Sequence, residues 1–141
     1  LVKNIINLLK DEKCKNKYMY LNGDNPKEKR KLIKTISQKL GVNLIEINCL
    51  DYNDEYSISK FINSNYLYNL LEDQSNSFII FNNYDSCNKV MYNLINSMLV
   101  NGFITNNINE KIYLNNAVMF IFNNQSLSNL GFNNNNLLFA H

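Results

Sequence analysis

The sequence predicts an α/β fold in which a parallel central sheet lies between two layers of helices. Short apolar segments alternate along the chain with longer segments of helical periodicity, which is the pattern of βαβ units. The segment 77–82, SFIIFN, is apolar almost throughout, as a strand covered on both faces should be. The chain has 141 residues, 45% of them hydrophobic, which suffices for one core. We therefore expect a single three-layer α/β/α domain over residues 1–141.

The elements of the first half follow from apolar spacing and from the residues at their ends. Apolar side chains recur at helical spacing over 1–10, and the short apolar run YMYLN ends before a glycine. The segment 27–40 should be a helix because Pro26 precedes it and Gly41 follows it, and its inward face should include Ile33 and Leu40. The expected elements are a helix over 1–10, a strand over 18–22, a helix over 27–40 and a strand over 44–48.

The second half continues the alternation. The helix over 88–101 has the clearest pattern, since Met91, Ile95 and Met98 share one face and Gly102 can end it. The run AVMFIFN is continuously apolar and predicts another buried strand. The expected elements are helices over 57–62 and 67–74, a strand over 77–82, the helix over 88–101, a hairpin or extended excursion over 102–115, and a strand over 117–123. The tail GFNNNNLLFA has no periodicity that predicts an element.

Charge and composition exclude several classes of protein. The net charge is +2 and the charged residues are intermixed, so neither nucleic acid nor a membrane is expected as a partner. No apolar run approaches the roughly 20 residues of a membrane span. His141 is the only histidine, which excludes a histidine-based triad or a multi-histidine metal site, and no metal ligands are predicted. Cys14, Cys49 and Cys87 form no CxxC motif and are expected to be reduced thiols.

Asparagine makes up about one residue in five, far above ordinary usage, while arginine occurs once, at Arg30. Asparagine, lysine, isoleucine and tyrosine are encoded by AT-rich codons, so we interpret the enrichment as genome bias. The asparagines are spread through periodic apolar pattern, which argues against a prion-like segment. The bias suggests a small AT-rich genome, such as that of a relict plastid. The expected location is therefore the stroma of a plastid-type organelle (an apicoplast), or otherwise the soluble interior of a cell.

The carboxyl ends of the predicted strands carry the candidate functional residues, because ligands of open α/β sheets bind at that edge. The first strand is followed by NGDNPKEKRKL, in which Gly23 and Lys29 have the spacing of the phosphate-binding pattern GxxxxGK[ST]. Three positions depart from that pattern. Glu28 replaces the second glycine, Arg30 replaces the Ser/Thr, and Pro26 removes a backbone N–H. Taken alone, this segment is at least as consistent with a charged helix start.

Three later segments carry a family resemblance. INCLDYNDEYSISKFI (47–62) resembles I-D-M-S-E-Y-x-x-x-x-S-V-S-[RK]-L-I of Clp-type AAA+ unfoldases, without a gap. SFIIFNNYDSCNKVMYNLINSMLVNGFITN (77–106) is similar to their S-V-I-L-[LF]-D-E-I-E-K-A-H segment and the helix that follows it. NAVMFIFNN (116–124) resembles N-[TA]-[VI]-[IV]-[IV]-x-T-S-N. The resemblance implies a P-loop NTPase fold, namely the large subdomain of the C-terminal Clp ATPase module, with the small helical lid subdomain outside this chain.

The resemblance assigns roles to individual positions. Lys29 matches the Walker A lysine that contacts the β- and γ-phosphates. Asn82 falls where the Walker B aspartate holds Mg²⁺, and Asn83 falls where a glutamate activates the attacking water. Asn124 matches the sensor-1 asparagine, while Asp85 matches a second, non-catalytic acidic position. Only Lys29 and Asn124 are retained, so both catalytic carboxylates are replaced by amides.

The expected function follows from these losses. An amide offers no charge to Mg²⁺ and no base to water, so we expect a degenerate Clp-family subunit that does not hydrolyse ATP on its own. The residues that would contact the cofactor are Gly23, Lys29, Arg30 and Asn82, and ATP with Mg²⁺ should bind weakly or not at all, because Glu28 repels phosphate. The expected partners are intact Clp-type ATPase subunits in a mixed ring and a Clp protease. The alternatives are a residually ATP-binding unfoldase and a clamp-loader-like subunit acting on DNA.

Two further features have a structural and a functional interpretation. Tyr66 or Tyr68 can stand in for the substrate-gripping aromatic of the family's pore loop, although local packing is the commoner role of such tyrosines. The cluster of basic residues at the start of the second helix is either a solvated face or a contact for polyphosphate or nucleic acid.

Overall fold

The computed structural model describes residues 1–13, 16–73, 76–123 and 139–140, and its centre is a five-stranded sheet in the order β2-β3-β6-β1-β7. Four strands run parallel: β1 (Lys17–Leu21), β2 (Asn43–Asn48), β3 (Ser77–Asn82) and β6 (Ala117–Phe122). β7 (Phe139–Ala140) pairs with the outer edge of β1 in the antiparallel direction. The predicted α/β class with a parallel central sheet is therefore confirmed, except at this short edge strand.

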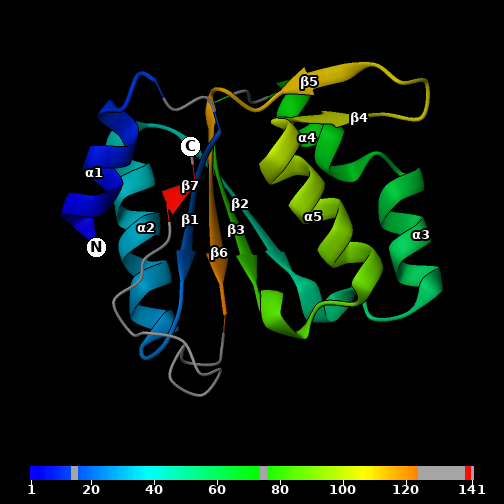
Figure 1. The fold of residues 1–141 in the computed structure, drawn as a ribbon, viewed down its shortest axis with the longest axis horizontal. Coiled ribbons are helices and arrows are strands. Elements are labelled where there is room, and N and C mark those ends of the chain that lie inside the picture. Colours follow the sequence, from blue (N-terminus) through cyan, green and yellow to red (C-terminus); the bar gives the residue numbers. More distant parts are fainter. Residues whose placement is uncertain (14–15, 74–75, 124–138, 141) are drawn as a thin grey trace.

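Helices cover both faces of the sheet (Figure 1). α1 (Val2–Lys10) and α2 (Pro26–Leu40) pack on one face, and α3 (Glu55–Asn63), α4 (Tyr66–Asp73) and α5 (Lys89–Asn101) lie on the other. The chain passes from β1 through α2 to the far strand β2 and then returns through β3 to β6. Because crossovers between parallel strands are right-handed, this reversal of direction places α2 and the later helices on opposite faces.

Successive side chains along the strands point in turn into two apolar cores, one on each face of the sheet. Phe78 and Ile80 of β3 belong to the core under α1 and α2, whereas Ile79 and Phe81 belong to the core under α3, α4 and α5. Every residue of β6 is buried. Each such side chain contributes about 1.5–3 kcal/mol relative to an exposed position, so these central strands dominate the stability of the fold.

The observed elements agree closely with the expected ones. The segment 102–115 is a hairpin of β4 (Phe103–Thr105) and β5 (Lys111–Tyr113). α3 begins two residues earlier than predicted because Asp54 Oδ1 accepts a hydrogen bond of 2.7 Å from the Ser57 amide and caps the helix. Two 3₁₀ turns were not predicted, η1 (Cys49–Asp51) and η2 (Tyr84–Ser86). No helix in the described part of the chain is long and apolar enough to cross a membrane.

The inward faces of the helices follow the predictions with one exception. Met91, Ile95 and Met98 of α5 are buried, as is Ile33 of α2. Leu40, however, is 54% exposed at the end of α2, and the prediction that it faces the core is wrong. Ser37 occupies a buried position instead, where its hydroxyl donates a hydrogen bond of 2.7 Å to the Lys34 carbonyl.

Candidate functional site

The candidate site lies at the carboxyl edge of the sheet, where β1, β3 and β6 end beside the start of α2. Only residues 22–25 connect β1 to α2, because the helix already begins at Pro26. Gly23 (φ 89°) and Asn25 (φ 60°) adopt left-handed backbone conformations in this connection, which glycine and asparagine tolerate best. The helix therefore occupies positions that a phosphate-wrapping loop would need for itself.

Lys29 is folded back over this short connection. Its Nζ donates a hydrogen bond of 3.0 Å to the carbonyl oxygen of Asn22, and its backbone N–H bonds to the Asn25 carbonyl at 3.1 Å. A phosphate cradle uses backbone N–H groups that point at the ligand. Here Pro26 has no N–H, and the Lys29 N–H is already used within the helix start. The lysine thus remains at the site with its ammonium group bound to main chain.

Arg30 spans the gap between α2 and the ends of β3 and β6. One guanidinium nitrogen donates to Asn82 Oδ1 at 3.5 Å, and the guanidinium carbon lies 5.8 Å from the centre of the Phe122 ring. Glu28 is exposed in the first turn of α2. Among the described residues, the side chain of Arg30 therefore interacts with Asn82 and Phe122.

Asn83 has a conformational role as well as a polar one. It follows β3 with a left-handed backbone (φ 58°) and begins η2. Its side-chain amide donates a hydrogen bond of 2.7 Å to Asn48 Oδ1, at the end of the neighbouring strand β2. Asparagine adopts this conformation more readily than a long side chain such as glutamate. Asn83, at the predicted water-activating position, thus tolerates the left-handed backbone, and the side chain of Asn48 holds its amide in place.

Asn123 and Asn22 form a second amide pair, which sequence analysis did not identify. The Nδ2 of Asn123 donates to Asn22 Oδ1 at 2.6 Å, and its backbone N–H bonds to the Leu21 carbonyl at 3.0 Å. The Oδ1 of Asn123 is buried and has no partner among the described residues. The predicted sensor residue, Asn124, lies outside those residues. The signal for Asn123 was present in the sequence, since both amides of the FNN run follow a buried strand.

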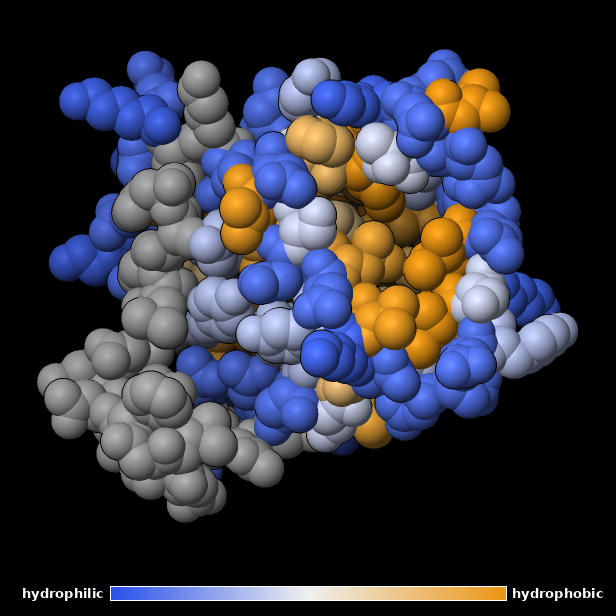
Figure 2. All heavy atoms as spheres, turned by 45° about the vertical axis from the view of Figure 1, so that its right-hand side comes forward, coloured by the Kyte–Doolittle hydropathy of each residue, from blue (hydrophilic) through white to orange (hydrophobic). Residues whose placement is uncertain are grey.

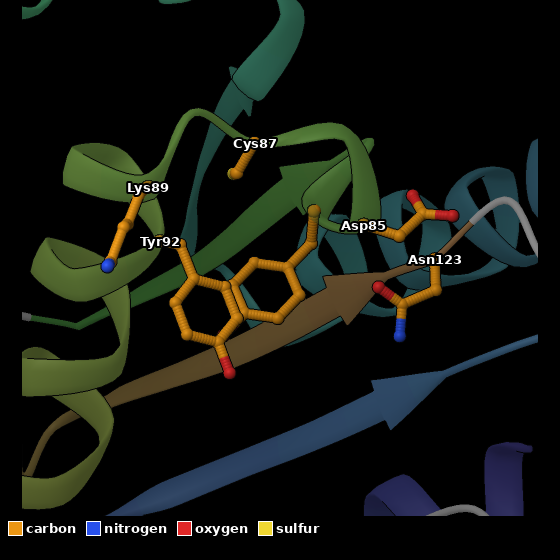
Figure 3. Close-up of a pocket in the computed structure, with 6 residues that line it drawn as sticks. Asp85, Cys87, Lys89, Tyr92 and Asn123 are labelled. Atoms are coloured by element: carbon orange, nitrogen blue, oxygen red, sulfur yellow. The ribbon is translucent and has the colours of Figure 1, made fainter.

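A pocket of about 410 Å³ lies beside Asn123, which is one of its lining residues (Figure 3). In this view Lys89 and Tyr92 of α5 face Asp85 and Asn123 across the pocket, and Cys87 lies at its border. Tyr84 completes the lining and stacks on Tyr92, with 5.2 Å between ring centres and 25° between the planes.

Burial raises the pKa of the Tyr84 hydroxyl, and the neighbouring Tyr20 and Tyr92 raise it further. Tyr84 is therefore a neutral phenol at physiological pH, and it gives the pocket an aromatic wall without adding charge.

The donor set at the carboxyl edge does not suit a magnesium nucleotide. Asn82, Asn83 and Asn48 are neutral amides that interact with Arg30 or with one another, and Lys29 and Arg30 add two cations to this edge. Hard cations prefer carboxylate oxygens. The described residues contain no group of three or more histidine, cysteine or acidic side chains that could hold a metal ion. The predicted site residues Lys29, Arg30 and Asn82 are thus brought together, but in a site without the charge that the cation needs.

The two candidate pore-loop tyrosines lie in different environments. Tyr68 is only 7% exposed, so its role is to pack in the core. Tyr66 is 47% exposed, and its ring centre lies 5.9 Å from that of Phe61. Tyr66 also lines a groove of about 390 Å³ along α3 with Tyr52 and Lys60. Of the two, only Tyr66 is placed to contact another molecule.

No model of a known protein family matches the chain, and no curated protein matches it.

Proposed function

We propose that the chain is the large α/β subdomain of a Clp-type AAA+ subunit that has lost ATP hydrolysis and acts structurally in a protein-unfolding or Clp protease ring. The observation that carries this proposal is the meeting of Lys29, Arg30 and Asn82 at one carboxyl edge. Asn82 is far in the sequence from the adjacent residues Lys29 and Arg30, and the resemblance assigns all three positions to the same nucleotide site.

The loss of hydrolysis is argued from the chemistry of this edge. Asn82 supplies no negative charge for Mg²⁺, and its Oδ1 accepts from Arg30. Asn83 cannot take a proton from water, so general base catalysis, worth roughly 10²–10⁴-fold, is missing. The short connection over residues 22–25 and the engaged ammonium group of Lys29 further weaken phosphate binding.

A role in a ring is argued from what the chain retains. Both cores are intact although the catalytic groups are gone. Figure 2 shows apolar side chains gathered in a hollow on the face that carries α3 and α5. Several large apolar side chains of this half of the molecule are strongly exposed: Ile62, Tyr66, Val90, Val100, Ile108 and Tyr113. Clustered apolar surface marks sites of protein contact, which supports intact Clp-type ATPase subunits or a Clp protease as partners.

The AT-rich composition supports a plastid-type organelle as the location, where an intact Clp ATPase encoded elsewhere can enter the same ring. Recovery of the native protein from its source, followed by native mass spectrometry, tests this part of the proposal. We expect a mixed assembly that contains an intact Clp-type ATPase. Recovery as a monomer without such a partner would remove the support for a mixed ring.

An assay of ATP turnover tests the other part. We expect no turnover above background by the wild-type chain, and none by the Lys29→Ala variant. Turnover that disappears in Lys29→Ala would instead identify a residually active unfoldase. Stimulation of that turnover by DNA would favour the clamp-loader-like alternative.

A further inference from the structure

Two cysteines that are far apart in the sequence meet beside the carboxyl edge. Cys49 begins η1, directly after β2, and Cys87 directly follows η2, after β3. β2 and β3 are adjacent and parallel, with Asn48 opposite Asn82, so the segments that leave them run side by side. The hydrogen bond of 2.7 Å between Asn83 and Asn48 holds these two segments together. Both thiols are free, and Cys87 packs against the apolar core cluster to which the buried Cys49 belongs.

The two thiols differ in reactivity. Interaction with the Cys49 thiol lowers the pKa of Cys87, although burial and the nearby Asp85 carboxylate act in the opposite direction. The same interaction, followed by burial, raises the pKa of Cys49. A lowered pKa favours the thiolate, which is the nucleophile in thiol chemistry.

The two thiols differ in access as well. Cys49 is completely buried, whereas Cys87 is partly exposed and lines the pocket beside Lys89 and Tyr92 (Figure 3). Cys87 is therefore open to a small molecule in this pocket, whereas the buried Cys49 does not line it. This is the arrangement of an attacking thiol and a resolving thiol.

We propose that Cys49 and Cys87 form a redox modification site that reacts with low-molecular-weight disulfides. The Cys87 thiolate attacks one sulfur of the disulfide, forming a mixed disulfide and releasing one small thiolate. The Cys49 sulfur then attacks the Cys87 sulfur, which forms the Cys49–Cys87 bond and releases a second small thiolate, and the Cys49 proton passes to that leaving group. The protein dithiol is oxidised and the small disulfide is reduced to two thiols, so atoms and electrons balance.

The Cys49–Cys87 disulfide would link the segment that follows β2 covalently to the segment that follows β3. The hydrogen bonds of the Lys29 and Arg30 side chains are made to Asn22 and Asn82 and involve neither cysteine. The disulfide would restrain the segments that carry Asn48 and Asn83, and with them one wall of the pocket.

The experiment uses the Cys14→Ser protein, which leaves only the two thiols of interest. The protein is incubated with oxidised glutathione and examined by intact mass and by non-reducing peptide mapping. We expect a transient glutathione adduct on Cys87 that converts to an internal disulfide, with a mass lower by two hydrogens. The closed protein should show a higher Tm than the reduced one, and dithiothreitol should reverse both changes.

Two variants on the same background separate the roles. Cys49→Ala should stop at the stable Cys87 adduct, because the resolving thiol is missing. Cys87→Ser should form neither the adduct nor the disulfide, because the buried Cys49 is out of reach of the reagent. A Cys87 adduct that persists in the presence of Cys49 would overturn the proposal. So would a wild-type chain in which Cys14 reacts while Cys87 does not.

Discussion

The interior of the sheet and its carboxyl edge differ in what holds their side chains in place. Inside, residues such as Ile79 and Phe120 alternate strictly between two apolar cores, and their positions are set by burial. At the edge, amide side chains hydrogen-bond in pairs, Asn83 with Asn48 and Asn123 with Asn22. An amide is enough for such pairing and a catalytic carboxylate is not required. The comparison indicates how a fold can keep its core while the groups at its site change.

Truncation in the interior should have the largest effect on stability. Phe120 is fully buried on β6, the strand between β3 and β1, and its ring centre lies 5.2 Å from that of Phe78 with 65° between the ring planes. Phe120→Ala should lower the free energy of unfolding by about 3–5 kcal/mol, because it removes apolar contacts and leaves a cavity. Asn82→Ala, at the carboxyl edge, should cost less than about 1 kcal/mol, because it removes one long hydrogen bond.

Urea denaturation followed by circular dichroism measures both changes. Equal losses in the two variants would contradict the distinction between interior and edge.

The same distinction decides how much of the structure could be predicted. The strands and helices were placed within a few residues because apolar periodicity is imposed by burial, as at Met91 and Ile95 of α5. The prediction that Leu40 is buried failed because apolar periodicity does not show where the end of a helix projects beyond the core. Leu40 is the last residue of α2, and Gly41 ends the helix in a left-handed conformation. β7 was not predicted because a strand of two residues is too short to show an apolar periodicity in the sequence.

The site was predictable in its positions but not in its contacts. The ends of apolar strands and the start of α2 indicated Lys29 and Asn82, because parallel strands present their carboxyl ends at one edge. Which amides pair could not be predicted, since polar contacts between distant segments depend on register and on backbone conformation. The pairing of Asn123 with Asn22 and the meeting of Cys49 and Cys87 are of this kind.

Introducing a carboxylate at Asn83 should reduce stability. Asn83 has φ 58° and bonds to Asn48 at 2.7 Å. Asn83→Glu should cost about 1–3 kcal/mol, because glutamate adopts this backbone less readily and loses the amide donor. Asn83→Gly is the matched control, since it relieves the backbone while removing the same hydrogen bond. Thermal unfolding should rank the proteins as wild type, then Asn83→Gly, then Asn83→Glu. The reverse order of the two variants would show that the backbone conformation is not limiting.

A carboxylate at position 82, next to Asn83, should form an ion pair with Arg30. Asn82→Asp places a negative charge near the guanidinium that now donates to Asn82 Oδ1 at 3.5 Å. The expected gain is about 0.5–1 kcal/mol, because the pair is partly exposed, and it should shrink as salt is added. We expect no further rise in Tm when Mg²⁺ is added. The gain should disappear in the Asn82→Asp, Arg30→Ala double variant, and a gain that survives there would exclude the ion pair as its cause.

The smallest expected effect is a pH dependence away from both regions, at the start of α3. Hydrogen bonds from the Ser57 amide and hydroxyl lower the pKa of Asp54 from its ordinary value of 3.8. A pKa that is lower in the folded state means that the ionised carboxylate stabilises the fold above the unfolded pKa, and that this stability is lost as pH falls through the folded pKa. Asp54→Asn keeps a helix cap without the titration. Between about pH 5 and pH 3, the wild type should therefore lose slightly more Tm than Asp54→Asn. Because the Asp54 carboxylate is fully exposed, the difference should be small and should shrink in high salt, and an Asp54→Asn protein with the steeper loss would reverse the sign assigned here.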